Sequence, residues 1–355
     1  MTLTRIPCTY MRGGTSRGLV FHARDLPADR KDWDAIFLAA MGVPDGAGRN
    51  LDGMGGGLSS LNKVCVIGPP TRNDADVDYT FAQCAVREAL VDYGGNCGNM
   101  SALVGPFAVE EGLAACPQHG EATVLIHNTN TGKIIVSRFP VEDGALAASG
   151  ALSIDGVEGT AAPIRLEFLS PGGAKTGKLL PSGQASDMAQ GIEISCIDAA
   201  NPCVFVAAEA VGKTGRETPQ ELDADAAFLA AMEAIRQAGA ALMGIAGSAS
   251  VPLVAMVAPA DSAAADITVR MISMGQPHRA TPITGAICLA LAARIPGSIP
   301  QRLCSASEGP LRIAHPSGVT MVDAALTGAG EAEYGAVYRT ARRLFEGNVV
   351  IPGSI

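Results

Sequence analysis

The chain has 355 residues, 48% of them hydrophobic and 17% charged, which is enough to build two lobes with separate cores. The formal net charge of −9 argues against nucleic acid or an anionic membrane as a partner. Nine cysteines are scattered without a CxxC pair, and the first residues show no hydrophobic signal region. We therefore expect a cytoplasmic protein with reduced thiols, no membrane span, and local clusters of donors wherever it binds an anion.

The first motif lies in a predicted hairpin. Residues 6–10 alternate like a strand, and residues 19–21 return after a turn rich in glycine, hydroxyl and arginine side chains. Glycine lets the backbone approach a ligand closely, and arginine suits a carboxylate. The candidate binding residues of this turn are Arg12, Gly13, Gly14, Thr15, Ser16 and Arg17. The alternative is a flexible surface turn with solvated arginines.

A lysine at the mouth of a strand is the second candidate. Residues 25–41 are predicted to be helical, and a loop rich in Gly and Asp at 44–57 leads to Lys63 and the apolar strand 64–67. A lysine held there is a candidate base if it is desolvated, and an ordinary surface lysine otherwise. The next strand, 77–85, would place Tyr79 and Phe81 on one face, with Gln83 next in the alternation.

The third motif precedes a predicted apolar helix at 101–109. Cys97 lies among glycines and asparagines at 94–99, so it would sit at the helix N-terminus with Asn96, Gly98 and Asn99. A helix start offers unpaired N–H groups that bind anions and activate a thiol. The alternative is an inert cysteine buried in a tight turn.

The second half of the chain repeats this order of elements. A strand at 192–198, a polar turn with Asn201, and a strand at 203–206 are followed by a helix at 221–244 and strands at 251–257 and 267–272. A polar loop at 275–285 then opens the apolar helix 286–292. We expect an N-terminal lobe at 1–187 and a C-terminal lobe at 188–355, with the C-terminal segment free to cross back. The three arginines of 338–345 are expected to form a solvated face.

Several short motifs, each weak alone, together are specific for one protein family. These motifs are residues 11–16, 52–56, Lys63, 95–99, 198–202, 278–279 and 284–285. The sequence resembles the 2-methylaconitate isomerase (PrpF-type) family, which also contains 4-oxalomesaconate tautomerases and methylitaconate isomerases. The resemblance covers essentially the whole chain.

The resemblance implies an α/β, diaminopimelate-epimerase-like fold: two pseudo-symmetric lobes, each a sheet wrapped around a central helix, with the active site between them. It implies proton transfer without a cofactor, with Lys63 and Cys97 as catalytic residues. The substrate-binding residues are expected to be those of the 12–17 turn together with Asn96, Gly98, Asn99, Asn201, His278, Arg279, Thr284 and Gly285. The implied partner is a small di- or tricarboxylate, and a homodimer is compatible with the sequence.

Three departures from the family pattern concern substrate identity more than reaction type. Arg17 stands where many relatives carry lysine, Asn62 replaces a serine, and the Gly/Ser loop at 55–61 is altered. In the second lobe, Thr284 and Gly285 stand where racemising relatives in the wider superfamily carry a second cysteine. We expect Cys288 to be core, which argues against a two-thiol epimerase.

We favour a 1,3-allylic proton shift on 4-oxalomesaconate, because the chain is short for a methylaconitate isomerase. The alternatives are 2-methylaconitate or methylitaconate isomerisation and, more distantly, a non-catalytic polycarboxylate-binding protein. The five histidines are dispersed, which disfavours a metal hydrolase.

Overall fold

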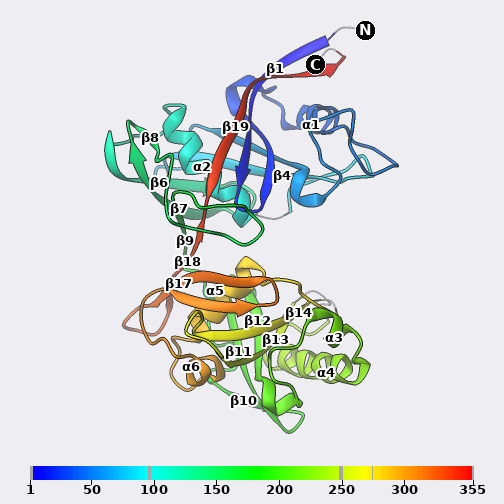
Figure 1. The fold of residues 1–355 in the computed structure, drawn as a ribbon, viewed down its shortest axis with the longest axis vertical. Coiled ribbons are helices and arrows are strands. Elements are labelled where there is room, and N and C mark those ends of the chain that lie inside the picture. The colour runs from blue at the N-terminus through cyan, green and yellow to red at the C-terminus, as the bar shows by residue number, and fades with distance from the viewer. Residues whose placement is uncertain (1–2, 95–96, 248–250, 274, 354–355) are drawn as a thin grey trace. The chain divides into compact units, whose positions relative to one another are not determined.

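The computed structural model describes residues 3–94, 97–247, 251–273 and 275–353. The chain divides into a first unit, Met1–Glu167 with Tyr338–Ile355, and a second unit, Phe168–Val337 (Figure 1). The boundary lies at 167/168 instead of the expected 187/188, and the C-terminal segment returns to the first unit. Strands β9 (Ile164–Leu169) and β18 (Ala332–Arg339) each contain one of the two boundaries.

The first unit is a mixed sheet in the order β19-β1-β2-β3-β4-β6-β7-β9, with the short strands β5 and β8 at its margins. The β2–β3 and β4–β6 pairs are parallel, and β19–β1, β1–β2, β3–β4 and β6–β7 are antiparallel. Its strands besides β9 are β1 (Leu3–Gly13), β2 (Ser16–His22), β3 (Lys63–Gly68), β4 (Val77–Cys84), β5 (Val91–Asp92), β6 (His119–Asn128), β7 (Lys133–Glu142), β8 (Ala145–Leu146) and β19 (Ala341–Pro352).

Two helices cover opposite faces of this sheet. Helix α1 (Trp33–Met41) packs its Trp33 and Phe37 against side chains of β1, β2 and β3. Helix α2 (Gly98–Glu110) is buried at every residue from Met100 to Val109 and contacts β1, β2, β3, β4, β6, β7, β8 and β19. A helix that is apolar all round belongs in the centre of a fold, and α2 is the central helix of this unit.

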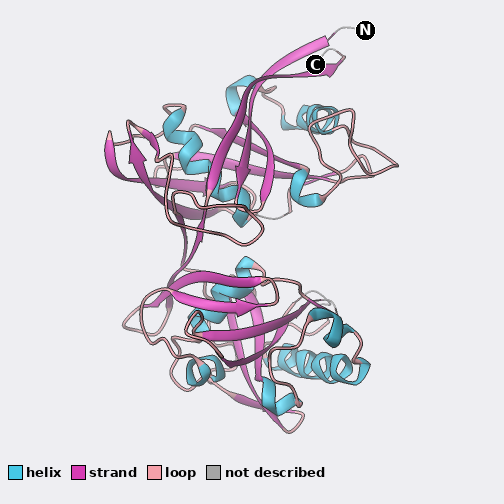
Figure 2. Ribbon diagram, in the orientation of Figure 1, coloured by secondary structure: helices cyan, strands magenta, loops and turns pink. Residues whose placement is uncertain are grey.

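The second unit has its own mixed sheet and central helix (Figure 2). Its strands besides β18 are β10 (Asp187–Ala189), β11 (Ile192–Ala199), β12 (Asn201–Ala207), β13 (Leu253–Pro259), β14 (Ile267–Ser273), β15 (Gln276–Pro277), β16 (Leu311–His315) and β17 (Gly318–Leu326). Its helices are α3 (Pro219–Asp223), α4 (Ala226–Leu242), α5 (Ile283–Ala292) and α6 (Ile299–Leu303). Helix α5 is buried at every residue from Gly285 to Ala292, whereas α4 packs one face on β11, β12 and β13. In the described part of the chain, no helix is both long and apolar enough to cross a membrane.

The two units repeat one pairing pattern. In the first, β1–β2, β2–β3, β3–β4, β4–β6 and β6–β7 are antiparallel, parallel, antiparallel, parallel and antiparallel. In the second, β11–β12, β12–β13, β13–β14, β14–β16 and β16–β17 follow the same series. The central helix enters between the fourth strand and the fifth in both cases. The internal repeat expected from the sequence is confirmed.

Several expected elements differ in detail. The helix expected at 25–41 is an α-helix in its second half, where α1 begins at Trp33. One short 3₁₀ turn, Ala23–Asp25, ends where the expected helix would begin, and a second, Arg30–Asp32, lies in its first half. The helix expected at 221–244 is split, because the Asp225 carboxylate accepts the N–H of Phe228 and starts α4 afresh. The segment 338–345 forms the end of β18 and the start of β19.

Candidate active site

Cys97 lies at the N-cap of α2, as the sequence predicted. Its carbonyl accepts the N–H of Ser101 at 2.8 Å and the Ser101 hydroxyl at 3.0 Å, and its side chain is partly exposed. The Cys97 side chain makes no capping hydrogen bond, and the first N–H groups of a helix are a favourable place for an anion. Gly98 and Asn99 form the first turn, whereas Asn96 lies outside the described residues.

Lys63 begins β3 and is only 8% exposed. Its ammonium nitrogen lies 2.7 Å from Oε1 of Gln83 and 5.0 Å from the centre of the Phe81 ring. The Gln83 amide nitrogen donates to the carbonyls of Ser59, Asn62 and Cys84, which turns its oxygen toward Lys63. The described residues place no carboxylate within ion-pair distance of Lys63, so its neighbours are a neutral amide and an aromatic ring.

Lys63 and Cys97 share one face of the sheet. Cys65 is buried two residues after Lys63 on that face, and its thiol responds electrostatically to both Lys63 and Cys97. Burial raises the pKa of Cys65 and that of the neighbouring Tyr79, so both stay neutral. The partly exposed Cys97 is therefore the accessible thiol of this cluster.

Close backbone approaches at two glycines hold this arrangement. A Cβ on Gly18 would lie 1.9 Å from the carbonyl oxygen of Lys63, so only glycine lets β2 pair with β3 at this register. Gly14 has a φ of +53°, and a Cβ there would lie 2.2 Å from Oδ1 of Asn99. The Asn99 amide in turn donates to the Thr15 hydroxyl at 3.0 Å. The 13–15 turn thus packs directly on the start of α2.

Asn62, the departure noted before Lys63, is a fully buried structural hub. Its Oδ1 accepts the N–H of Gly56 at 3.0 Å, and its amide donates to Oδ1 of Asn50 at 3.0 Å. Asn50 is also buried and accepts the N–H of Gly57. These two asparagines fix the glycine loop that leads into Lys63, a role that a serine is too short to fill.

The structure does not bring Arg12 and Arg17 to Lys63. The two residues pair across the β1–β2 hairpin, and Arg17 stacks over Tyr10 at 5.8 Å, on the face covered by α1. Lys63 pairs with Gly18, the residue after Arg17. Because successive residues of a strand face opposite sides of the sheet, Arg17 faces away from the side on which Lys63 lies. Arg12 donates to the carbonyls of Gly14 and Thr340 and so anchors the hairpin turn. Ser16, which pairs with Gly13, is buried.

Arg339 is the basic residue that sequence reasoning missed. It was expected on a solvated face, but its Nε donates to Oδ1 of Asn99 at 3.2 Å and its side chain is partly buried. Burial lowers the pKa of Arg339 to about 10, while Cys97 acts on it in the opposite direction. Of the other two arginines, Arg343 bridges Glu110, Glu111 and Glu346, and Arg342 alone is fully exposed. No sequence signal distinguishes the three.

The predicted residues of the second unit gather around two turns. Asn201 follows Ala200, whose φ is +57°, at the tip of the β11–β12 hairpin. His278 Nδ1 contacts the carbonyl of Ala280, and the backbone carbonyl of Arg279 accepts the Ser317 hydroxyl. The Arg279 side chain and Thr284 are exposed, while Gly285 is buried against Met271 at the start of α5. Cys288 is fully buried in α5, so the prediction that it belongs to the core is confirmed.

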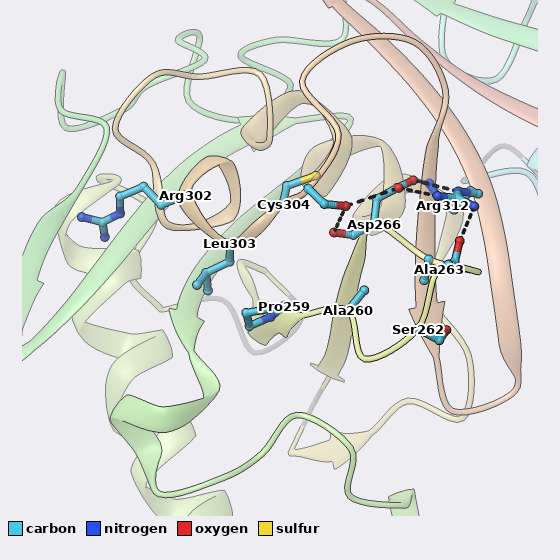
Figure 3. A pocket seen from close by; sticks show the side chains of 11 residues that line it. Pro259, Ala260, Ser262, Ala263, Asp266, Arg302, Leu303, Cys304 and Arg312 are labelled. Atoms are coloured by element: carbon cyan, nitrogen blue, oxygen red, sulfur yellow. Dashed lines mark hydrogen bonds and ion pairs between the residues drawn. The ribbon is translucent and has the colours of Figure 1, made fainter.

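A hollow in the second unit is lined by none of these residues, and Figure 3 shows side chains that line it, among them Asp266, Arg302 and Arg312. Its charges are already paired: Arg312 binds Asp266 at 2.7 Å, and Arg302 binds Glu193 at 2.7 Å. Among the described residues, no group of three or more His, Cys, Asp or Glu side chains is arranged to hold a metal ion. Lys63 and Cys97 remain the candidate catalytic residues.

Comparisons with known proteins cover nearly the whole chain. The family model described as PrpF protein matches residues 3–352. The 4-oxalomesaconate tautomerase of Pseudomonas putida is 43% identical over 357 residues, covering 99% of this chain and 97% of the relative. The crystal structure of a methylitaconate-delta-isomerase superposes with a TM-score of 0.93 at 39% identity, covering 99% of this chain and 96% of that one.

A more distant structure shows the fold alone. A hydroxyproline epimerase from Agrobacterium vitis superposes with a TM-score of 0.50 at 14% identity, covering 98% of this chain and 92% of that one. The expected diaminopimelate-epimerase-like architecture is confirmed. On the family match and the near-complete alignment to isomerases and tautomerases, the chain belongs to the PrpF family, and it is an isomerase.

Proposed function

We propose that this isomerase moves a double bond by a 1,3-proton shift on an unsaturated di- or tricarboxylate, with 4-oxalomesaconate as the substrate. One observation carries the proposal: Lys63 is buried and faces the neutral amide of Gln83 instead of a carboxylate. A buried lysine at the start of a strand, held by a neutral amide and not tied up in an ion pair with a described carboxylate, is placed to exchange a proton with a bound substrate.

The reaction uses two proton-transfer groups. The Lys63 amine removes a proton from a carbon acidified by an adjacent carbonyl or carboxylate, and the electron pair spreads into that group as an enolate. The Cys97 thiol delivers a proton two carbons away, so the double bond shifts and the composition of the substrate is unchanged. Lys63 and Cys97 then exchange one proton, through solvent, to restore the starting state. The N–H groups at the start of α2 stabilise the enolate charge.

The choice of 4-oxalomesaconate is supported by the Pseudomonas putida tautomerase, whose 357-residue alignment barely exceeds the length of this chain. The second candidate is methylitaconate, which the superposition with a methylitaconate-delta-isomerase favours. Arg279 of the second unit remains a predicted substrate-binding residue: it is exposed and makes no side-chain ion pair with a described residue.

Proton NMR in D₂O distinguishes these substrates. Purified protein is incubated separately with 4-oxalomesaconate, methylitaconate and 2-methylaconitate, and deuterium uptake and double-bond migration are followed. We expect both with 4-oxalomesaconate. Double-bond migration with methylitaconate or 2-methylaconitate alone would identify that acid as the substrate instead. No exchange with any of the three acids would contradict the proposal.

Lys63→Met tests the base. Methionine keeps most of the volume and removes the amine, so turnover should fall by about 10²- to 10⁴-fold, the usual contribution of a positioned acid–base group. The control is Lys133→Met, which changes an exposed lysine of β7 in the same unit and should retain full activity. Near-wild-type turnover by Lys63→Met, with an unchanged melting temperature, would show that another group is the base.

A further inference from the structure

Arg339 is an arginine that forms no ion pair with any residue that the structure describes. It ends β18, and its guanidinium makes two hydrogen bonds, both to neutral oxygens: Nε to Asn99 Oδ1 at 3.2 Å and Nη1 to the Tyr338 carbonyl at 2.8 Å. No carboxylate of the described residues lies within ion-pair distance of it. Nη2 forms no hydrogen bond with the residues that the structure describes.

The contrast with its neighbour Arg343 is informative. Arg343 contacts Glu110, Glu111 and Glu346 at 2.8, 3.0 and 3.2 Å and closes the C-terminal end of α2. Arg339 lies at the other end of α2, where the helix dipole is positive and does not favour a cation. A partly buried cation next to a positive helix end is destabilising unless an anion joins them.

Asn99 fixes the orientation of the Arg339 guanidinium. The Asn99 amide group accepts from Arg339 and donates to Thr15, so it holds the guanidinium against the 13–15 turn. Arg339 and Cys97 interact electrostatically, which places the guanidinium near the thiol. An anion that bound Nη2 would therefore lie between a guanidinium, the start of α2 and the Cys97 thiol.

We propose that Arg339 binds a carboxylate of the substrate at the N-terminus of α2 and thereby holds the reacting carbon beside Cys97. This inference rests on the proposed function for the identity of the substrate, but not for the existence of the anion site. It assigns to Arg339 the role that sequence reasoning gave to Arg12 and Arg17, which lie on the other face of the sheet.

The test uses alkylation of Cys97 and needs no turnover. Iodoacetate and iodoacetamide attack the same thiolate, and only iodoacetate carries a carboxylate. The rate of each reagent at Cys97 is measured by peptide mass spectrometry for the wild type, Arg339→Gln, Arg339→Lys and the matched control Arg342→Gln, whose arginine is exposed. Intrinsic thiol reactivity cancels in the ratio of the two rates.

We expect the iodoacetate-to-iodoacetamide ratio to fall about 10- to 100-fold in Arg339→Gln, the effect of losing a charge-assisted hydrogen bond. The ratio should fall less in Arg339→Lys, which keeps the charge without the planar fork, and should not change in Arg342→Gln. An equal ratio in the wild type and a folded Arg339→Gln would overturn the proposal. If Arg339→Gln does not fold, an unchanged ratio in Arg339→Lys would overturn it.

Steady-state kinetics then connects the anion site to the reaction. With the substrate identified by NMR, Arg339→Gln should raise KM by about 10-fold or more, since a ground-state carboxylate contact is lost. If the iodoacetate-to-iodoacetamide ratio falls in Arg339→Gln but the wild type turns over none of the three acids, the anion site is supported and only the proposed function is refuted. An unchanged KM in an active Arg339→Gln would overturn the role in substrate binding.

Discussion

The two repeats share one topology but differ at the two proposed catalytic positions. Lys63 begins β3 in the first repeat, and Leu253 begins the corresponding strand β13 in the second. Cys97 precedes the central helix α2, whereas Pro282 precedes α5. A repeated pattern of pairing therefore supplies two helix N-termini, while the base and the thiol of the candidate site come from the first repeat.

A third difference shows how the lysine is accommodated. Gly18 pairs with Lys63 in the parallel β2–β3 ladder, and Cys203 pairs with Leu253 in the parallel β12–β13 ladder. A side chain fits at Cys203, which is buried, but at Gly18 it would collide with the Lys63 backbone. In the first repeat, the absence of a side chain at Gly18 lets β2 and β3 approach closely at Lys63.

The largest effect that would test this difference between the repeats is expected at Cys97, at the start of α2. Cys97→Ala should lower isomer formation by about 10²-fold or more, because the proton donor is lost, but it should retain deuterium exchange at the carbon that Lys63 deprotonates. The control is Cys288→Ala in α5, which removes a buried thiol from the second central helix and should cost only about 1 kcal/mol of stability. Full isomer formation by Cys97→Ala, measured by NMR, would mean that Lys63 returns the proton itself.

An intermediate effect is expected at Gly18. Gly18→Ala places a methyl group 1.9 Å from the Lys63 carbonyl, so β2 and β3 must separate, which should cost about 1 to 3 kcal/mol of stability and displace the lysine. We expect a lower melting temperature together with a lower kcat. Gly46→Ala, whose added Cβ meets nothing within 4 Å, should change neither quantity. A normal kcat in Gly18→Ala would show that the position of Lys63 does not depend on the close approach of β2 at Gly18.

The smallest effect is expected in the acid stability of the second unit, at the Asp266–Arg312 ion pair. Hydrogen bonding to Arg312 lowers the pKa of Asp266 below its ordinary value of 3.8. The folded state therefore holds this proton less tightly than the unfolded state, so the pair stabilises the fold above about pH 4 and loses that contribution as pH falls through the folded pKa. Between pH 7 and pH 3, the melting temperature of Asp266→Asn should fall less than that of the wild type. The exposed carboxylate variant Glu308→Gln should follow the wild type, and parallel curves for all three would contradict this role for the pair.

The architecture was largely readable from local patterns. Alternation along 77–85 predicted that Tyr79, Phe81 and Gln83 share a face, and the contact of Gln83 with Lys63 confirms it. The apolar run after Cys97 predicted a buried helix with the cysteine at its start. The repeated order of strand, turn, strand and helix predicted two similar units. Each of these features depends on neighbours within a few residues, so composition and periodicity determine them.

What the tertiary structure decided is which charged residues meet. Arg12 and Arg17 belong to the same turn as Thr15, yet the pleat directs them to the α1 face. Arg339 lies 240 positions from Asn99 in the chain and contacts it only because the C-terminal segment returns to the first unit. Sequence alone determined the chemistry available at Lys63 and Cys97, because a helix start and a strand start are local features. The cation beside them was decided by strand register and chain return, which are long-range pairings that no local pattern encodes.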